Sequence, residues 1–169
     1  EIRIGDWSSD VCSSDLENVP DLTDDFIMWS DDQFITKDTE WSDTTPRYIK
    51  IYDANTKPYF DDMGKKRIWW KRLQKCFERF PNSGFGCRFF NPHIPSPMNK
   101  YKFIEMCNKF PYQTEDGITI YDLYYNFIGE KGVPNFDEYH VISGETDWKD
   151  CRWVGYFNSS MKNKRFIEK

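Results

Sequence analysis

Basic and aromatic side chains are interleaved between residues 65 and 90. The residues of this segment that could bind nucleic acid are Lys65, Lys66, Arg67, Trp70, Lys71, Arg72, Lys75, Arg79 and Arg88. Lysine and arginine would neutralise backbone phosphates, and the indole of Trp70 would stack on an unpaired base. The alternative interpretation is an amphipathic helix whose rings belong to the core and whose charges are solvated.

Groups capable of acid–base or nucleophilic chemistry are present, but they form no motif. His93 or His140 could act as a general base, and Cys151 with His140 could form a nucleophile pair. Cys87, His93 and Cys107 are too widely spaced for a typical zinc site, and no Gly-rich phosphate loop occurs. We therefore predict a non-catalytic protein without a metal or cofactor.

Three tryptophans have acidic neighbours in segments that look irregular. Trp29, Trp41 and Trp148 would form a stacking platform beside aspartates, which is a pattern that suits a sugar or a protein partner. The alternative is that these rings are buried against a sheet, which is the commoner fate of tryptophan.

The N-terminal segment has an unusual origin. Residues Asp6 to Leu16 read Asp-Trp-Ser-Ser-Asp-Val-Cys-Ser-Ser-Asp-Leu, and their back-translation resembles a common sequencing-library adapter. The resemblance implies that residues 1–16 are non-native and that 17–169 is one domain, truncated at its N-terminus. The first sixteen residues hold four acids and one arginine, so 17–169 has 24 acids, 22 Lys+Arg and a net charge of -2 instead of -5.

Composition narrows the class of protein. The chain has 169 residues, is 30% charged and 18% aromatic, and contains no apolar run near the roughly 20 residues of a membrane span. Without Cys12, the cysteines are Cys76, Cys87, Cys107 and Cys151, whose irregular spacing favours buried free thiols in a reducing compartment. A cytoplasmic location is therefore the default expectation.

Charge is segregated along the chain. Residues 17–63 have a net charge of -8, residues 64–103 of +9 and residues 104–169 of -3. The basic block would either face a polyanion or pack against the acidic block.

Periodicity predicts the elements that position these residues. Residues 17–45 look irregular, and the prolines of 91–97 predict a rigid connector. Alternation over Arg47–Asp53 predicts a strand with Ile49 and Ile51 on one face, and Cys151–Phe157 a second strand. Helical stripes predict helices over 65–80 and 99–110, a third that begins at Thr119, and a short fourth that begins at Pro134. A short strand is expected within 85–90.

One run has a loose resemblance to a known family. Residues Leu123–Gly132, Leu-Tyr-Tyr-Asn-Phe-Ile-Gly-Glu-Lys-Gly, followed by Phe136, resemble the C-terminal domains of some viral primase-helicases. The resemblance implies a winged helix with Pro134–Val141 as the recognition element. The alternative is a strand over 139–143 that forms a hairpin with 151–157.

Together these patterns predict an α+β domain in which two or three helices pack on a small, mainly antiparallel sheet. The low alanine content and abundant Ile, Asn, Lys, Tyr and Phe are typical of an AT-rich genome, such as that of a phage or mobile element. We expect a nucleic-acid-associated protein whose partner is single- or double-stranded nucleic acid. The alternative is a structural or interaction protein of a phage, with a protein partner.

Overall fold

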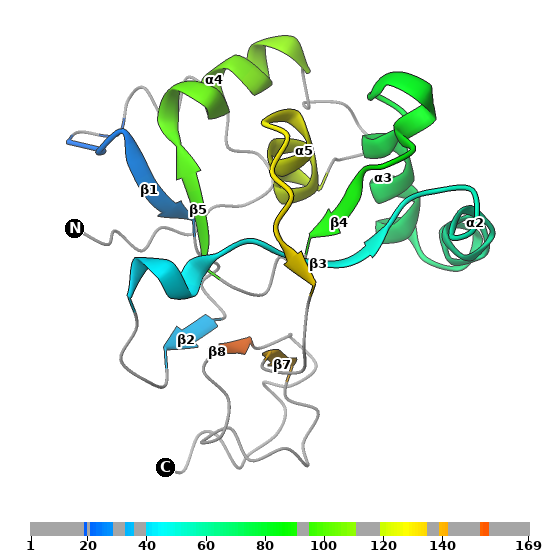
Figure 1. The fold of residues 1–169 in the computed structure, drawn as a ribbon, viewed down its shortest axis with the longest axis horizontal. Coiled ribbons are helices and arrows are strands. Elements are labelled where there is room, and N and C mark those ends of the chain that lie inside the picture. The colour runs from blue at the N-terminus through cyan, green and yellow to red at the C-terminus, as the bar shows by residue number, and fades with distance from the viewer. Residues whose placement is uncertain are drawn as a thin grey trace.

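Figure 1 shows the fold in a computed structural model of the chain. The structure describes Val19 and residues 21–28, 40–90, 95–110 and 119–134, and the backbone alone of residues 33–35, 139–141 and 153–155. The elements are β1 (Asp25–Met28), β2 (Gln33–Ile35), the 3-10 helix η1 (Trp41–Thr44), β3 (Arg47–Ile51), α2 (Lys57–Lys66), α3 (Ile68–Phe77), the short turn η2 (Pro81–Gly84), β4 (Arg88–Phe90), β5 (Ser96–Asn99), α4 (Lys100–Lys109), α5 (Ile120–Phe127), β6 (Val133–Pro134), β7 (Tyr139–Val141) and β8 (Trp153–Gly155). The segment 1–16, Trp29, His93, Trp148 and Cys151 lie outside the described residues.

The strands form three small sheets. β1 pairs with β5, β8 lies between β2 and β7, and β3 lies between β4 and β6. Pairing is antiparallel except between β3 and β6 and between β7 and β8. The predicted α+β class is confirmed. Four α-helices occur in the described residues, because the helical region begins earlier than expected and is interrupted.

Helix α5 occupies the centre of the described fold. It contacts α3, α4 and strand β4, and Figure 1 shows it between α4 and α3. The largest fully buried side chains are Phe60, Leu73, Phe77, Phe90, Phe103, Met106, Leu123 and Tyr124. The aromatic composition is therefore used to build a core from rings in edge-to-face contact.

The helix predicted over 65–80 is present as α3 over Ile68–Phe77, but residues 65 and 66 belong to α2, and the two helices meet at Arg67. Arg67 has extended backbone angles (φ -141°, ψ 128°), which end α2 and precede α3. In one continuous helix, residues 60 and 77 would lie about 25 Å apart along the axis. The break lets the helices pack on each other, and the rings of Phe60 and Phe77 lie 5.8 Å apart. Core burial thus overrides local periodicity.

Strand β3 begins where alternation predicts, and its pairing with β4 is irregular. The register with β4 shifts between Tyr48 and Lys50, and Ile49 is 45% exposed. Tyr52, just beyond the strand, is buried instead. Alternation places positions 49 and 52 on opposite faces, which agrees with the exposed Ile49 and the buried Tyr52.

The C-terminal elements also differ from the winged-helix expectation. Val133–Pro134 and Tyr139–Val141 are strands, so the helix predicted from Pro134 through His140 is wrong in these residues. The alternative strand at residue 139 is confirmed over Tyr139–Val141, and its partner is β8. The two strands run parallel, so they do not form the expected hairpin.

Other local predictions are confirmed. Helix α4 begins after Asn99, whose side chain accepts a hydrogen bond from the Lys102 N–H, and α5 begins after Thr119. Cys76, Cys87 and Cys107 are buried free thiols. The segment expected to be irregular contains short elements, because β1 pairs with β5 across a large sequence separation that local patterns do not encode.

Candidate functional site

Helix α3 separates its charged and apolar residues cleanly. Leu73, Cys76 and Phe77 are buried, and no acidic residue occurs between Ile68 and Phe77. The cations follow the opposite side of the helix: Lys71, Arg72 and Lys75 lie on α3, and Arg79 lies in the turn that follows it. With 3.6 residues per turn, positions 71, 72, 75 and 79 lie on one side of the helix, together with the exposed Ile68. We call Lys71, Arg72, Lys75 and Arg79 the basic face.

The predicted residues before α3 are arranged differently. Lys65 and Lys66 end α2, and Arg67 forms the junction; all three are exposed. Lys66 forms an ion pair with Asp62, one turn earlier on α2. On the same helix, Asp61 pairs with Lys57 and accepts a hydrogen bond from Gln74 Nε2 of α3 (2.8 Å). Helix α2 therefore contains both acidic and basic residues, which form ion pairs, whereas the charged residues of α3 are all basic.

Trp70 is a packing residue in this structure. Its ring makes edge-to-face contacts with Tyr59 (5.5 Å), Phe60 (5.5 Å) and Phe89 (5.2 Å), measured between ring centroids. The residue is half-buried, so these contacts cover part of the surface that base stacking would use. The cluster reaches solvent at Tyr59, which is 43% exposed and has Lys50 Nζ 4.8 Å from its ring centroid.

Sequence reasoning missed Lys50 and Tyr59 as a surface pair. The expected helix began at Lys65, so Tyr59 was assigned to no element, and the pair forms only when α2 packs beside β3. A cation over an aromatic face is a contact of tertiary structure without a local sequence signal.

Arg88 is the first residue of β4 and is separate from the basic face. Its contacts are with Tyr48 and Asn126. Its guanidinium lies 5.4 Å from the ring centroid of Tyr48. Its backbone N–H donates to Asn126 Oδ1 (2.8 Å), and its carbonyl accepts from Asn126 Nδ2 (2.8 Å). Helix α5 thus takes the place of a neighbouring strand along the free edge of β4.

A buried carboxyl of α5 also accepts a backbone hydrogen bond from the edge of β4. The Oδ1 atom of Asp122 accepts a hydrogen bond from the Phe90 N–H (2.7 Å), one helical turn before Asn126. Burial raises the pKa of Asp122 to about 8, against the opposing effects of the Phe90 N–H and the Thr119 hydroxyl. Burial and the nearby Asp122 also raise the pKa of the thiols of Cys76 and Cys87. Thiols held protonated in this way are poor nucleophiles, which favours a structural role.

The described residues contain no group of three or more His, Cys, Asp or Glu side chains placed to hold a metal ion. Within the same residues, no helix has the length and apolar character needed to cross a membrane.

Comparisons with protein families, with curated proteins and with solved structures found no match for the chain. The chemistry of the basic face therefore has to be inferred from its own residues.

Proposed function

We propose that the protein is a non-catalytic nucleic-acid-associated protein that binds backbone phosphates through the basic face of α3. The observation that carries this proposal is the alignment of Lys71, Arg72, Lys75 and Arg79 along one side of α3 and the turn after it, where residues 68–79 include a single acid, Glu78. Lys71 is exposed, and Arg72, Lys75 and Arg79 are half-buried. Each lysine or arginine that contacts a phosphate neutralises it and releases its counterion. Lys75 and Arg79 also lie near the C-terminal end of the helix, where positive charge is favoured by the helix dipole.

Because Trp70 is half-buried among other rings, the proposal relies on contacts with the phosphate backbone. Phosphate contacts alone position nucleic acid without reading its sequence. The expected binding is therefore insensitive to sequence and strongly dependent on salt. Four phosphate contacts give a slope of about -3.6 for log K against log salt on duplex DNA and about -2.8 on single strands.

The test is a salt titration of binding to a fluorescent 20-nucleotide single strand and to the matching duplex. The variant Lys71→Glu plus Arg72→Glu should weaken binding and reduce the slope by about two contacts, to roughly -1.8 on duplex DNA. The matched control is Lys100→Glu plus Lys131→Glu, which changes the net charge equally outside the basic face and should retain the slope. Thermal melting verifies that both variants are folded.

An unchanged slope in the Lys71→Glu plus Arg72→Glu variant would contradict the proposal. Equal losses in that variant and in the control would also contradict it, because they would indicate an effect of net charge alone. Either outcome would favour the alternative of a structural or interaction protein.

A further inference from the structure

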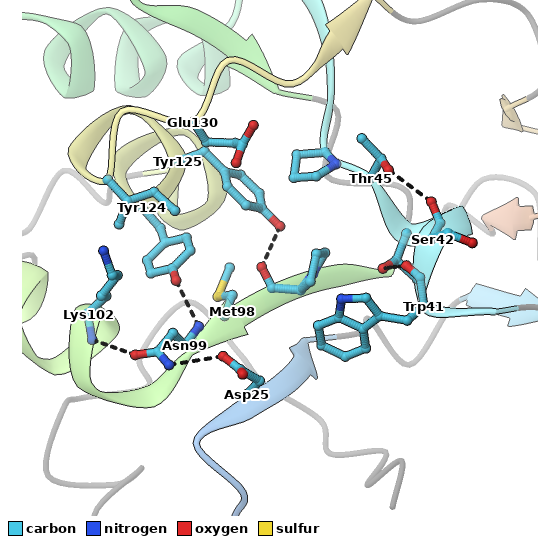
Figure 2. Close-up of a pocket in the computed structure, with 14 residues that line it drawn as sticks. Asp25, Trp41, Ser42, Thr45, Met98, Asn99, Lys102, Tyr124, Tyr125 and Glu130 are labelled. Atoms are coloured by element: carbon cyan, nitrogen blue, oxygen red, sulfur yellow. Dashed lines mark hydrogen bonds between the residues drawn. The ribbon is translucent and has the colours of Figure 1, made fainter.

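A pocket of about 550 Å³ lies between η1, the β1–β5 pair and the C-terminal end of α5 (Figure 2). This volume is within the range of about 300–1,000 Å³ that is typical of small-molecule sites. Its lining includes Asp25, Trp41, Asn99, Lys102, Tyr124 and Glu130, and it shares no residue with the basic face. The pocket is therefore a second surface with its own chemistry.

Trp41 presents an aromatic ring at this pocket. The side chain is 55% exposed, although tryptophan rings are usually well covered in folded proteins. Its backbone is held in η1: the Glu40 N–H donates to the Asp43 carboxylate (3.0 Å), and the Thr44 hydroxyl donates to the Trp41 carbonyl (2.7 Å). Figure 2 shows the indole across the pocket from Tyr124 and Lys102. A flat apolar surface is thus held in place and left open.

The opposite wall is fixed by hydrogen bonds. The Asn99 N–H donates to the Tyr124 hydroxyl oxygen (2.8 Å), and Asn99 Nδ2 donates to Asp25 Oδ1 (2.9 Å). The Tyr125 hydroxyl donates to the Pro97 carbonyl (3.0 Å), as Figure 2 shows. A wall that is already ordered loses little entropy when a ligand binds.

Polar groups on this wall retain hydrogen-bonding capacity. Asp25 Oδ2, Glu130 Oε2 and Lys102 Nζ make no hydrogen bond or ion pair with any described residue. The Tyr124 oxygen accepts from Asn99 and can donate its own proton. Burial, followed by the charges of Asp25 and Glu130, raises the pKa of Tyr124, so this proton stays in place at neutral pH. The pocket therefore offers both donors and acceptors.

The charges of the pocket restrict its ligand. Two carboxylates, Asp25 and Glu130, face one ammonium group, Lys102, so the lining is acidic on balance. An anionic ligand, including a nucleic-acid phosphate, would meet like charge. A neutral ligand with closely spaced hydroxyl groups would find a partner for each donor and acceptor, and its C–H face would find the indole.

We propose that this pocket binds a neutral saccharide. Trp41 stacks on the apolar face of a pyranose ring, while Asp25, Lys102 and Glu130 form hydrogen bonds with its hydroxyl groups. The size of the pocket suits one or two sugar units.

The experiment is a titration of the full chain with neutral oligosaccharides of glucose, galactose, mannose, xylose and N-acetylglucosamine, followed by the amide and indole N–H signals in NMR spectra. At least one series should shift the Trp41 indole signal in a saturable manner. Trp41→Ala should weaken binding at least about tenfold, equivalent to about 1.4 kcal/mol. Glu130→Gln, which keeps the shape but removes the charge, should weaken binding to a smaller extent.

The matched control is Phe85→Ala, which removes a ring that is also exposed (45%) but lies outside the pocket. This control should keep saccharide affinity within twofold of the parent chain, and the Lys71→Glu plus Arg72→Glu variant should do the same. Absence of a saturable shift with every oligosaccharide would overturn the proposal. Saccharide binding that survives Trp41→Ala, or binding of a proline-rich peptide in place of a sugar, would also overturn it.

Discussion

Replacing Asp122 by asparagine should raise the stability of the protein at neutral pH and flatten its dependence on pH. Asp122 is 1% exposed, and its Oδ1 atom accepts the Phe90 N–H. The Thr119 hydroxyl is near enough to lower the carboxyl pKa in part, but it does not reach hydrogen-bonding geometry with Oδ2. Asparagine keeps the Oδ1 acceptor and cannot ionise in either state. It therefore preserves the contact with β4 and removes the difference in proton binding between the folded and unfolded chain.

The sign of the effect follows from the proton count. Burial raises the pKa of Asp122 to about 8 in the folded chain, whereas an unfolded aspartate has a pKa of about 3.9. Between these values the folded state holds one proton more than the unfolded state, so the free energy of unfolding falls as pH rises. The slope is about 1.4 kcal/mol per pH unit, and the accumulated loss at pH 7 is roughly 3–5 kcal/mol.

This magnitude is large for a protein of ordinary stability. Domains commonly unfold with about 5–15 kcal/mol, so the cost of keeping this one buried carboxyl protonated at pH 7 is a large share of the total. Asp122→Asn should recover most of the loss at pH 7 and little of it at pH 4.5. Asp122→Ala, in contrast, leaves the buried Phe90 N–H without its acceptor and should cost about 1–3 kcal/mol relative to asparagine.

The assay is urea unfolding followed by circular dichroism, repeated from pH 4.5 to 8.5 for the parent chain and both variants. The control is Asp53→Asn: the N–H groups of Thr56 and Asn55 lower the pKa of Asp53, so its contribution is present above the unfolded pKa and has the opposite sign. Parallel curves for the parent chain and Asp122→Asn between pH 5 and 8 would refute the reasoning. They would mean that Asp122 is solvated or paired in solution.

Two further predictions concern the core and the turn before β4. Phe60→Ala removes a fully buried ring that contacts Phe77 and Trp70, and should lower the free energy of unfolding by about 3–5 kcal/mol in the same urea assay; a loss below 1 kcal/mol would contradict the packing of α2 on α3. Gly84→Ala should be more destabilising than Gly86→Ala in thermal melts. Both glycines have positive φ, but a Cβ at Gly84 would lie 2.3 Å from the Phe77 carbonyl oxygen, whereas one at Gly86 meets nothing within 4 Å; equal losses would show that φ alone matters.

The candidate sites were visible in the sequence to different degrees. The cations of the basic face were predicted because charge content and helical spacing are local properties of residues 71–79. Trp70 was proposed for base stacking, with a place in the core as the alternative, and the packing of α2 against α3 leaves it half-buried. Trp41 was identified as an exposed ring, but the wall that faces it comes from β5, α4 and α5, more than fifty residues later in the chain.

Sequence alone determined the α+β class, strand β3, the starts of α4 and α5, the buried thiols and the segregation of charge, because each depends on neighbouring residues and on the burial preference of side chains. Tertiary structure decided the break at Arg67, the exposure of Ile49, the parallel pairing of β7 with β8 and the formation of the pocket. These features arise from contacts between residues far apart in sequence. The core gains more from bringing Phe60 to Phe77 than a helix gains from remaining continuous, and no local pattern records that balance.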